Sequence, residues 1–74
     1  MNIYLLPICD CDQGYCRIEK VTARGITEAR EKFVKYLADT YDGVDYASTF
    51  EEAASILSEN LVDIGDIYDI DEFQ

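Results

Sequence analysis

The stretch Pro7-Ile-Cys-Asp-Cys-Asp-Gln-Gly-Tyr-Cys16 places three cysteines and two aspartates in the first quarter of the chain. Its centre, Asp12-Gln13-Gly14, is typical of a turn between two apolar segments. We therefore expect a β-hairpin, with strands at residues 2–9 and 15–23. Pro7 has no N–H group to give to a strand ladder, so it should lie near the strand end or on a free edge.

The three cysteines also allow other interpretations. Cys9, Cys11 and Cys16 form a C-x-C-x4-C pattern in a chain without histidine. A closed zinc site needs four ligands, so Asp10, Asp12 or another chain would have to supply the fourth. Thiolate catalysis would need a neighbouring base. We favour the turn, in which cysteine acts as a small hydrophobe, and expect no cofactor. The odd cysteine count argues against a disulfide framework, although Cys9 and Cys16 could face each other across the ladder.

Length and composition predict one compact domain over residues 1–74. The chain has 74 residues, of which 49% are hydrophobic, near the lower size at which a single core suffices. It contains no apolar run of about 18 residues, the length needed to span a bilayer. Its start lacks the basic region and cleavage site of a signal peptide. We therefore expect a soluble, cytoplasmic protein with reduced thiols.

Two amphipathic helices are predicted in the middle of the chain. The first should cover residues 28–40, with Thr27 as its N-cap. The second should begin after Thr49, because Thr49-Phe-Glu-Glu52 is a capping box, and Asn60 should end it. Apolar residues recur at helical spacing in both segments and should face the core: Phe33, Tyr36, Leu37, Phe50, Ala53, Ala54, Leu57 and Leu61.

The last segment, residues 61–73, alternates with period two and predicts a third strand. Its apolar set is Val62, Ile64, Tyr68 and Ile70, and its opposite set is Asp63, Gly65, Asp69 and Asp71. We expect a bulge or bend at Gly65, because the alternation fails next to it. The expected fold class is α+β, a small antiparallel three-stranded sheet with two helices on one face, in the order β-β-α-α-β.

Charge is distributed unequally along the chain. All six basic residues lie before residue 36, together with five of the acids. Residues 36–74 carry eleven acids and no base, and they account for the whole net charge of −10. Such asymmetry costs self-repulsion, and ordinary solubility does not require it. One interpretation is a solvated acidic surface, and the other is a surface that binds a basic partner.

The acidic half suits a basic partner because of its spacing. Alternate residues on a strand lie about 6.6 Å apart, and helical neighbours about 5–6 Å apart, which is close to the phosphate spacing of a nucleic-acid strand. We expect a basic nucleic-acid-binding protein as partner, with no direct binding of nucleic acid or membrane, and a monomer or small homo-oligomer. The candidate partner-binding residues are Asp42, Asp45, Glu51, Glu52, Glu59, Asp63, Asp66, Asp69, Asp71 and Glu72, with Tyr41, Tyr46 and Tyr68 as aromatic anchors.

The chain resembles a class of small phage-encoded α/β proteins. The resemblance lies in the start Met1-Asn-Ile-Tyr-Leu-Leu6, the short hairpin, and the helix opening Thr27-Glu-Ala-Arg30. Some proteins of this kind are anti-CRISPR or anti-restriction inhibitors that act as DNA mimics. The resemblance implies a non-enzymatic inhibitor in the host cytoplasm. Two alternatives remain, an antitoxin or immunity-type protein that neutralises a basic enzyme, and a small cysteine-based metal-binding module.

Overall fold

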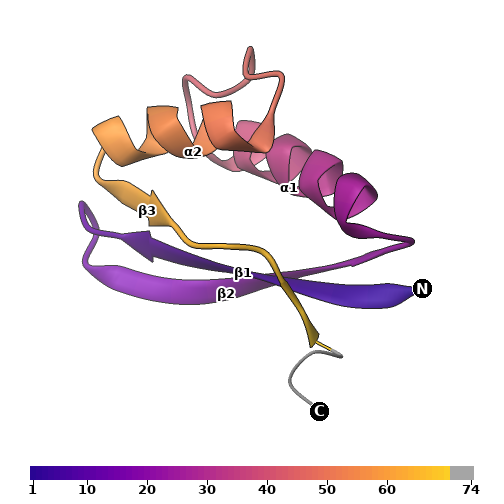
Figure 1. The fold of residues 1–74 in the computed structure, drawn as a ribbon. Coiled ribbons are helices and arrows are strands. Elements are labelled where there is room, and N and C mark those ends of the chain that lie inside the picture. The colour runs from indigo at the N-terminus through magenta and orange to yellow at the C-terminus, as the bar shows by residue number, and fades with distance from the viewer. Residues whose placement is uncertain (71–74) are drawn as a thin grey trace.

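The structure, a computed structural model, describes residues 1–70 as two helices packed on one face of an antiparallel sheet (Figure 1). The α+β class and the two helices are confirmed. The described part of the strand expected over residues 61–73 is divided in two, so the sheet within residues 1–70 has four strands. The elements in chain order are β1 (Asn2–Asp10), β2 (Tyr15–Ala23), α1 (Ile26–Thr40), α2 (Phe50–Glu59), β3 (Val62–Ile64) and β4 (Tyr68–Asp69).

The hairpin of β1 and β2 forms as expected, with Cys9 opposite Cys16. Its turn is closed by Asp10, which is buried and only 3% exposed. The Asp10 carboxylate accepts hydrogen bonds from the backbone N–H groups of Asp12 (3.1 Å) and Gln13 (3.0 Å), and its carbonyl accepts one from Gly14 (2.8 Å). These bonds offset the cost of burying a carboxylate. Gly14 has a φ of 80°, which favours glycine there.

Pro7 lies in the middle of the central strand, so the expectation of a strand end or free edge is wrong. β1 pairs with β2 on one side and with β3 and β4 on the other. The Gly65 N–H donates to the Pro7 carbonyl at 2.9 Å, which shows that the backbone of Pro7 faces the β3–β4 side. Between Ile64 and Tyr68 the segment that joins β3 to β4 does not pair with β1. A central proline is tolerated because the strand that would need its N–H group is interrupted beside it.

The interruption shifts the register by one residue, which confirms the bulge expected at Gly65. Ile64 lies opposite Ile8, whereas Tyr68 lies opposite Leu5. Four steps along one strand therefore match three along the other. Because side chains alternate between the two faces, this extra residue reverses the facing of everything after it.

The core lies between the sheet and the helices. Its largest fully buried side chains are Phe33, Leu6, Ile8, Leu37, Leu57 and Val44. Thr49 caps α2 as expected, because its hydroxyl accepts from the Glu52 N–H at 3.1 Å, and Asn60 ends that helix. The N-cap assigned to Thr27 is wrong, since α1 begins at Ile26 after Gly25 and has no side-chain cap. No helix within residues 1–70 is long and apolar enough to cross a membrane.

Candidate functional site

The fold places the basic residues on one side of the molecule and the unbalanced acidic residues on the other. α1 packs on β2 and α2 packs on β3, at opposite ends of the strand order β2-β1-β3. The basic residues belong to β2, to α1 or to the link between them: Arg17, Lys20, Arg24, Arg30, Lys32 and Lys35. We call the other side, formed by residues 41–49, α2, β3 and the link after it, the acidic side. It contains no lysine or arginine.

The candidate acids of the loop, α2 and β3 are all exposed on the acidic side: Asp42, Asp45, Glu51, Glu52, Glu59, Asp63 and Asp66. Three of them have close partners, and for Asp63 the partner is the Cys11 thiol at 3.8 Å. The Glu51 carboxylate pairs with Arg30 of α1, and Glu52 accepts from the Ser48 hydroxyl at 3.4 Å. Glu52 and Glu59 are seven residues apart on α2, about 10 Å along the helix axis. α2 and the loop before it therefore form the largest part of the acidic side.

The row of acids expected along one strand face does not form. Asp63 lies opposite Cys9 on the open face of the sheet. Asp69 lies opposite Tyr4, whose side chain is buried beneath the helices, and is itself half-buried. The bulge at Gly65 separates the two carboxylates onto opposite faces. Asp71 and Glu72 lie outside the described residues.

The three candidate tyrosines occupy different environments. Tyr46, in the loop before α2, is 71% exposed and lies next to Asp45 in the chain. Tyr68 is 39% exposed and lies opposite Leu5 on the open sheet face. Tyr41 is half-buried against the core, and its hydroxyl is buried. Tyr46 is thus the tyrosine of this set that is best placed to contact a partner of the acidic side.

The cysteines form a covalent link across the hairpin. Cys9 and Cys16 are joined by a disulfide, with their Cα atoms 4.0 Å apart, so the expectation of reduced thiols is wrong for this pair. Cys11 is free and exposed, and its thiol donates weakly to Asp63 at 3.8 Å. No group of three or more histidine, cysteine or acidic side chains within residues 1–70 is arranged to hold a metal ion.

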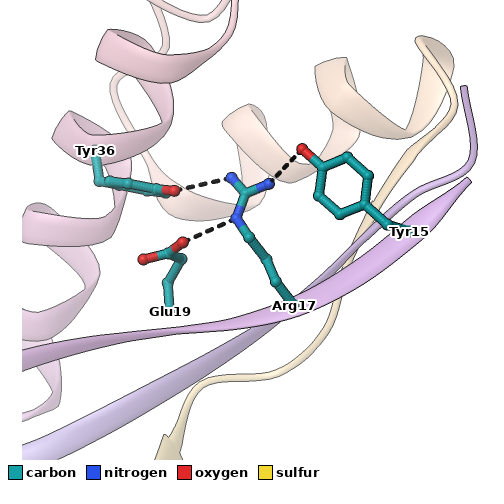
Figure 2. Close-up of polar contacts among 4 residues, drawn as sticks. All are labelled: Tyr15, Arg17, Glu19 and Tyr36. Carbon is teal, nitrogen blue, oxygen red and sulfur yellow. Dashed lines mark hydrogen bonds and ion pairs between the residues drawn. The ribbon is translucent and has the colours of Figure 1, made fainter. Parts of the chain in front are cut away.

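Sequence reasoning missed a polar cluster around Arg17, shown in Figure 2. Its guanidinium donates to Glu19 (2.8 Å), to the Tyr36 hydroxyl of α1 (2.8 Å) and to the Tyr15 hydroxyl (3.0 Å). It also lies 5.8 Å from the centre of the Tyr41 ring. The alternation of charge in β2 was the available signal, but the partner on α1 is nineteen positions away.

The cluster surrounds the guanidinium of Arg17, which is a cation at every accessible pH. Partial burial lowers the pKa of Arg17, but the hydrogen bonds to Tyr36 and Glu19 raise it by more, so the pKa lies above its usual range. The positive charge is neutralised locally by Glu19 and fixes β2 against α1. We interpret this cluster as structural, because its donors are directed at groups of the protein itself.

A cleft of about 600 Å³ opens between the two helices and the bulge. Apolar side chains line much of it, including Ile26, Phe50 and Ile67. Arg30 forms part of the cleft wall, and its guanidinium carbon lies 5.5 Å from the centre of the Phe50 ring. Such a cleft can accept an apolar side chain of a partner at the border of the acidic side.

No family model, curated protein or solved structure matches this chain, so its function is inferred from its own residues.

Proposed function

We propose that this protein is a non-enzymatic inhibitor that binds a basic nucleic-acid-binding protein through its acidic side, in the manner of a DNA mimic. The observation that carries the proposal is the composition of the acidic side. Exposed carboxylates project from the loop, from α2 and from β3, and no lysine or arginine of those segments balances them. A surface of one sign attracts a surface of the opposite sign over several ångströms and speeds the encounter.

The proposed contact surface is centred on α2. Glu52 and Glu59 are exposed on it, and neither forms an ion pair within residues 1–70. A groove that binds DNA presents lysines and arginines to successive phosphates, and carboxylates spaced along a helix can occupy the same positions. Each exposed charge pair contributes only about 0–1 kcal/mol. Binding should therefore be spread over many carboxylates, with Tyr46 as an apolar anchor.

The proposed setting is a bacterial cytoplasm during phage infection, although the Cys9–Cys16 disulfide is uncommon in that compartment. This part rests on the resemblance to phage-encoded inhibitors and on the acidity of the chain. A defence protein that binds nucleic acid, such as a CRISPR effector or a restriction enzyme, would be the partner. Blocking its nucleic-acid groove would need no catalysis by the inhibitor.

The test begins with capture of the partner from a bacterial lysate on immobilised protein. Binding of the purified partner is then measured at increasing salt and with short duplex DNA as competitor. We expect DNA to displace the protein and salt to weaken the complex. The Glu52→Lys/Glu59→Lys variant should bind much more weakly. The control, Glu28→Lys/Glu31→Lys on α1, changes the net charge equally and should bind nearly as well as wild type.

An antitoxin or immunity-type function is the second candidate, because the same acidic side would also suit a basic enzyme without a nucleic-acid groove. The competition experiment separates the two. If duplex DNA fails to compete at every salt concentration while the α2 variant still loses binding, DNA mimicry is wrong and neutralisation of a basic enzyme replaces it. Equal loss in both variants would contradict the assignment of the acidic side.

A further inference from the structure

β2 is an edge strand with a regular, accessible ladder. It has nine residues, and within residues 1–70 it pairs only with β1. The other border of the sheet is short and broken at the bulge. Ile18, near the centre of β2, is 66% exposed. A long edge of this kind is a template for pairing with another strand unless the protein protects it.

The register shows which backbone groups of β2 are directed outward. Successive residues of a strand direct their N–H and C=O groups to opposite neighbours. Pro7 and Cys9 direct theirs towards β3, so Ile8, between them, directs its groups towards Arg17 of β2. The alternate residues of β2, which include Ile18 and Lys20, must then direct their N–H and C=O groups away from β1.

One outward group is already occupied. The Lys32 ammonium of α1 donates to the Thr22 carbonyl, as expected if that carbonyl is directed outward. This contact blocks the last part of the edge. The stretch from Cys16 to Lys20 stays open for pairing.

We propose that the open stretch of β2 pairs with β2 of a second copy of this chain, antiparallel about a two-fold axis at Ile18. In this register Ile18 lies opposite its own copy on the open face. Arg17 lies opposite Glu19 of the other copy, and Cys16 lies opposite Lys20. The pairing makes one continuous sheet across two protomers, with the helices of both on the same face.

Charge selects this register over its neighbours. A two-fold axis at Arg17, Glu19 or Lys20 would place two like charges directly opposite each other, which destabilises a strand pair. The axis at Ile18 instead places Arg17 of each copy opposite Glu19 of the other copy. The 2.8 Å ion pair within each protomer would extend to a network of four charges. Charge complementarity along Arg17-Ile18-Glu19 therefore favours a second copy as the occupant of this edge.

The assembly should stop at two protomers. Each protomer has one long edge, and a two-fold pairing consumes it in both. The acidic side lies at the opposite end of the strand order, so the two acidic sides face away from each other and do not oppose association. This inference does not depend on the proposed function.

The first test is the mass of the protein in solution, measured by light scattering and sedimentation over a concentration series. All samples carry Cys11→Ser, so that the exposed thiol cannot form covalent dimers. We expect a reversible dimer. Ile18→Lys and Ile18→Glu should each weaken dimerisation by about tenfold or more, because like charges then meet at the axis. An equimolar mixture of the two variants should restore the dimer, since opposite charges then meet.

Two controls separate edge pairing from packing of the open faces. Ile3→Lys changes the open face of β1 and should leave the dimer intact. Ile18→Pro removes an outward N–H group and should abolish the dimer, while far-UV circular dichroism shows that the fold persists. Amide exchange of Ile18 and Lys20 should slow as concentration rises. A monomer at every concentration, or a dimer lost in Ile3→Lys and kept in Ile18→Pro, would overturn the proposal.

Discussion

At Pro7 the central strand lacks an N–H group, and Gly65 is the residue that makes this tolerable. Gly65 donates to the Pro7 carbonyl and approaches so closely that a Cβ atom there would lie 2.7 Å from the Pro7 Cγ. Only a residue without a side chain allows this contact while the neighbouring strand bulges away. Two residues far apart in the sequence thus determine where β3 ends and which face Asp69 occupies.

We therefore expect Gly65→Ser to destabilise the protein by about 1–3 kcal/mol, the usual cost of forcing extra atoms into a packed contact. The measurement is chemical denaturation followed by circular dichroism. Gly25→Ser is the matched control, because a Cβ atom at Gly25 meets nothing within 4 Å. It also offers α1 the side-chain cap that it lacks, so the control should be neutral or slightly stabilising. Pro7→Ala should recover part of the loss, and its failure to do so would count against the contact.

Among the elements, the two helices differ in how they begin. α2 is short and is capped by the Thr49 hydroxyl, whereas α1 begins at Ile26 without a side-chain cap and contains Thr27 in its first turn. A threonine occupies each predicted cap position. However, the helical conformation of α1 already begins at Ile26, one residue before Thr27. Local pattern identified both helices and located only one of the two caps.

The difference predicts that one substitution, threonine to alanine, has a large effect at one helix start and a small effect at the other. Thr49→Ala should cost about 1 kcal/mol of unfolding free energy, because the Glu52 N–H loses its acceptor. Thr27→Ala should change stability by less than about 0.5 kcal/mol, as expected for an exposed position inside a helix. Thermal and denaturant unfolding of the two variants measures both values. Equal losses would mean that Thr27 acts as a cap.

The hairpin is held by the Cys9–Cys16 disulfide as well as by its turn. Closing this short loop should contribute about 2 kcal/mol. Reductant should therefore lower the denaturation midpoint of the wild-type protein and of Cys11→Ser. It should leave the midpoint of Cys9→Ser/Cys16→Ser unchanged. A midpoint that does not respond to reductant in the wild-type protein would show that the disulfide adds nothing to stability.

The whole molecule is a charge dipole, with the basic residues on β2 and α1 and the unbalanced acids on the acidic side. The carboxylates of the acidic side repel one another, and the ion pair between Arg30 and Glu51 offsets only part of this repulsion. A surface built for function rather than stability would show this imbalance. If β2 pairs as proposed, the dimer would present two acidic sides at its opposite ends.

Salt should therefore stabilise the protein. Salt screens the repulsion between two carboxylates once the Debye length is shorter than their separation, which is about 10 Å for Glu52 and Glu59. We expect the melting temperature to rise by a few degrees, on the order of 1 kcal/mol, between low salt and about 0.5 M sodium chloride. Glu52→Lys/Glu59→Lys should show a smaller rise. A melting temperature that falls with salt would mean that attractive ion pairs outweigh the repulsion.

The sequence by itself determined the hairpin, the approximate extent of both helices and the cap of α2. Each of these depends on contacts between residues close together in the chain, such as Asp10 with its turn and Thr49 with Glu52. Periodicity and turn chemistry record such contacts directly. The unequal distribution of charge was also evident from the sequence.

Only the tertiary structure decided the placement of β1 at the centre of the sheet, the separation of Asp63 from Asp69, and the contact between Arg17 and Tyr36. The first two depend on which strand lies beside which, and on a register between segments more than fifty residues apart. The third joins a strand to a helix nineteen positions away. One added residue in a strand reverses every side chain after it. The failure of alternation indicated Gly65, but the size of the register shift could not be known without the partner strand, because the hydrogen bonds that set the register belong to both strands.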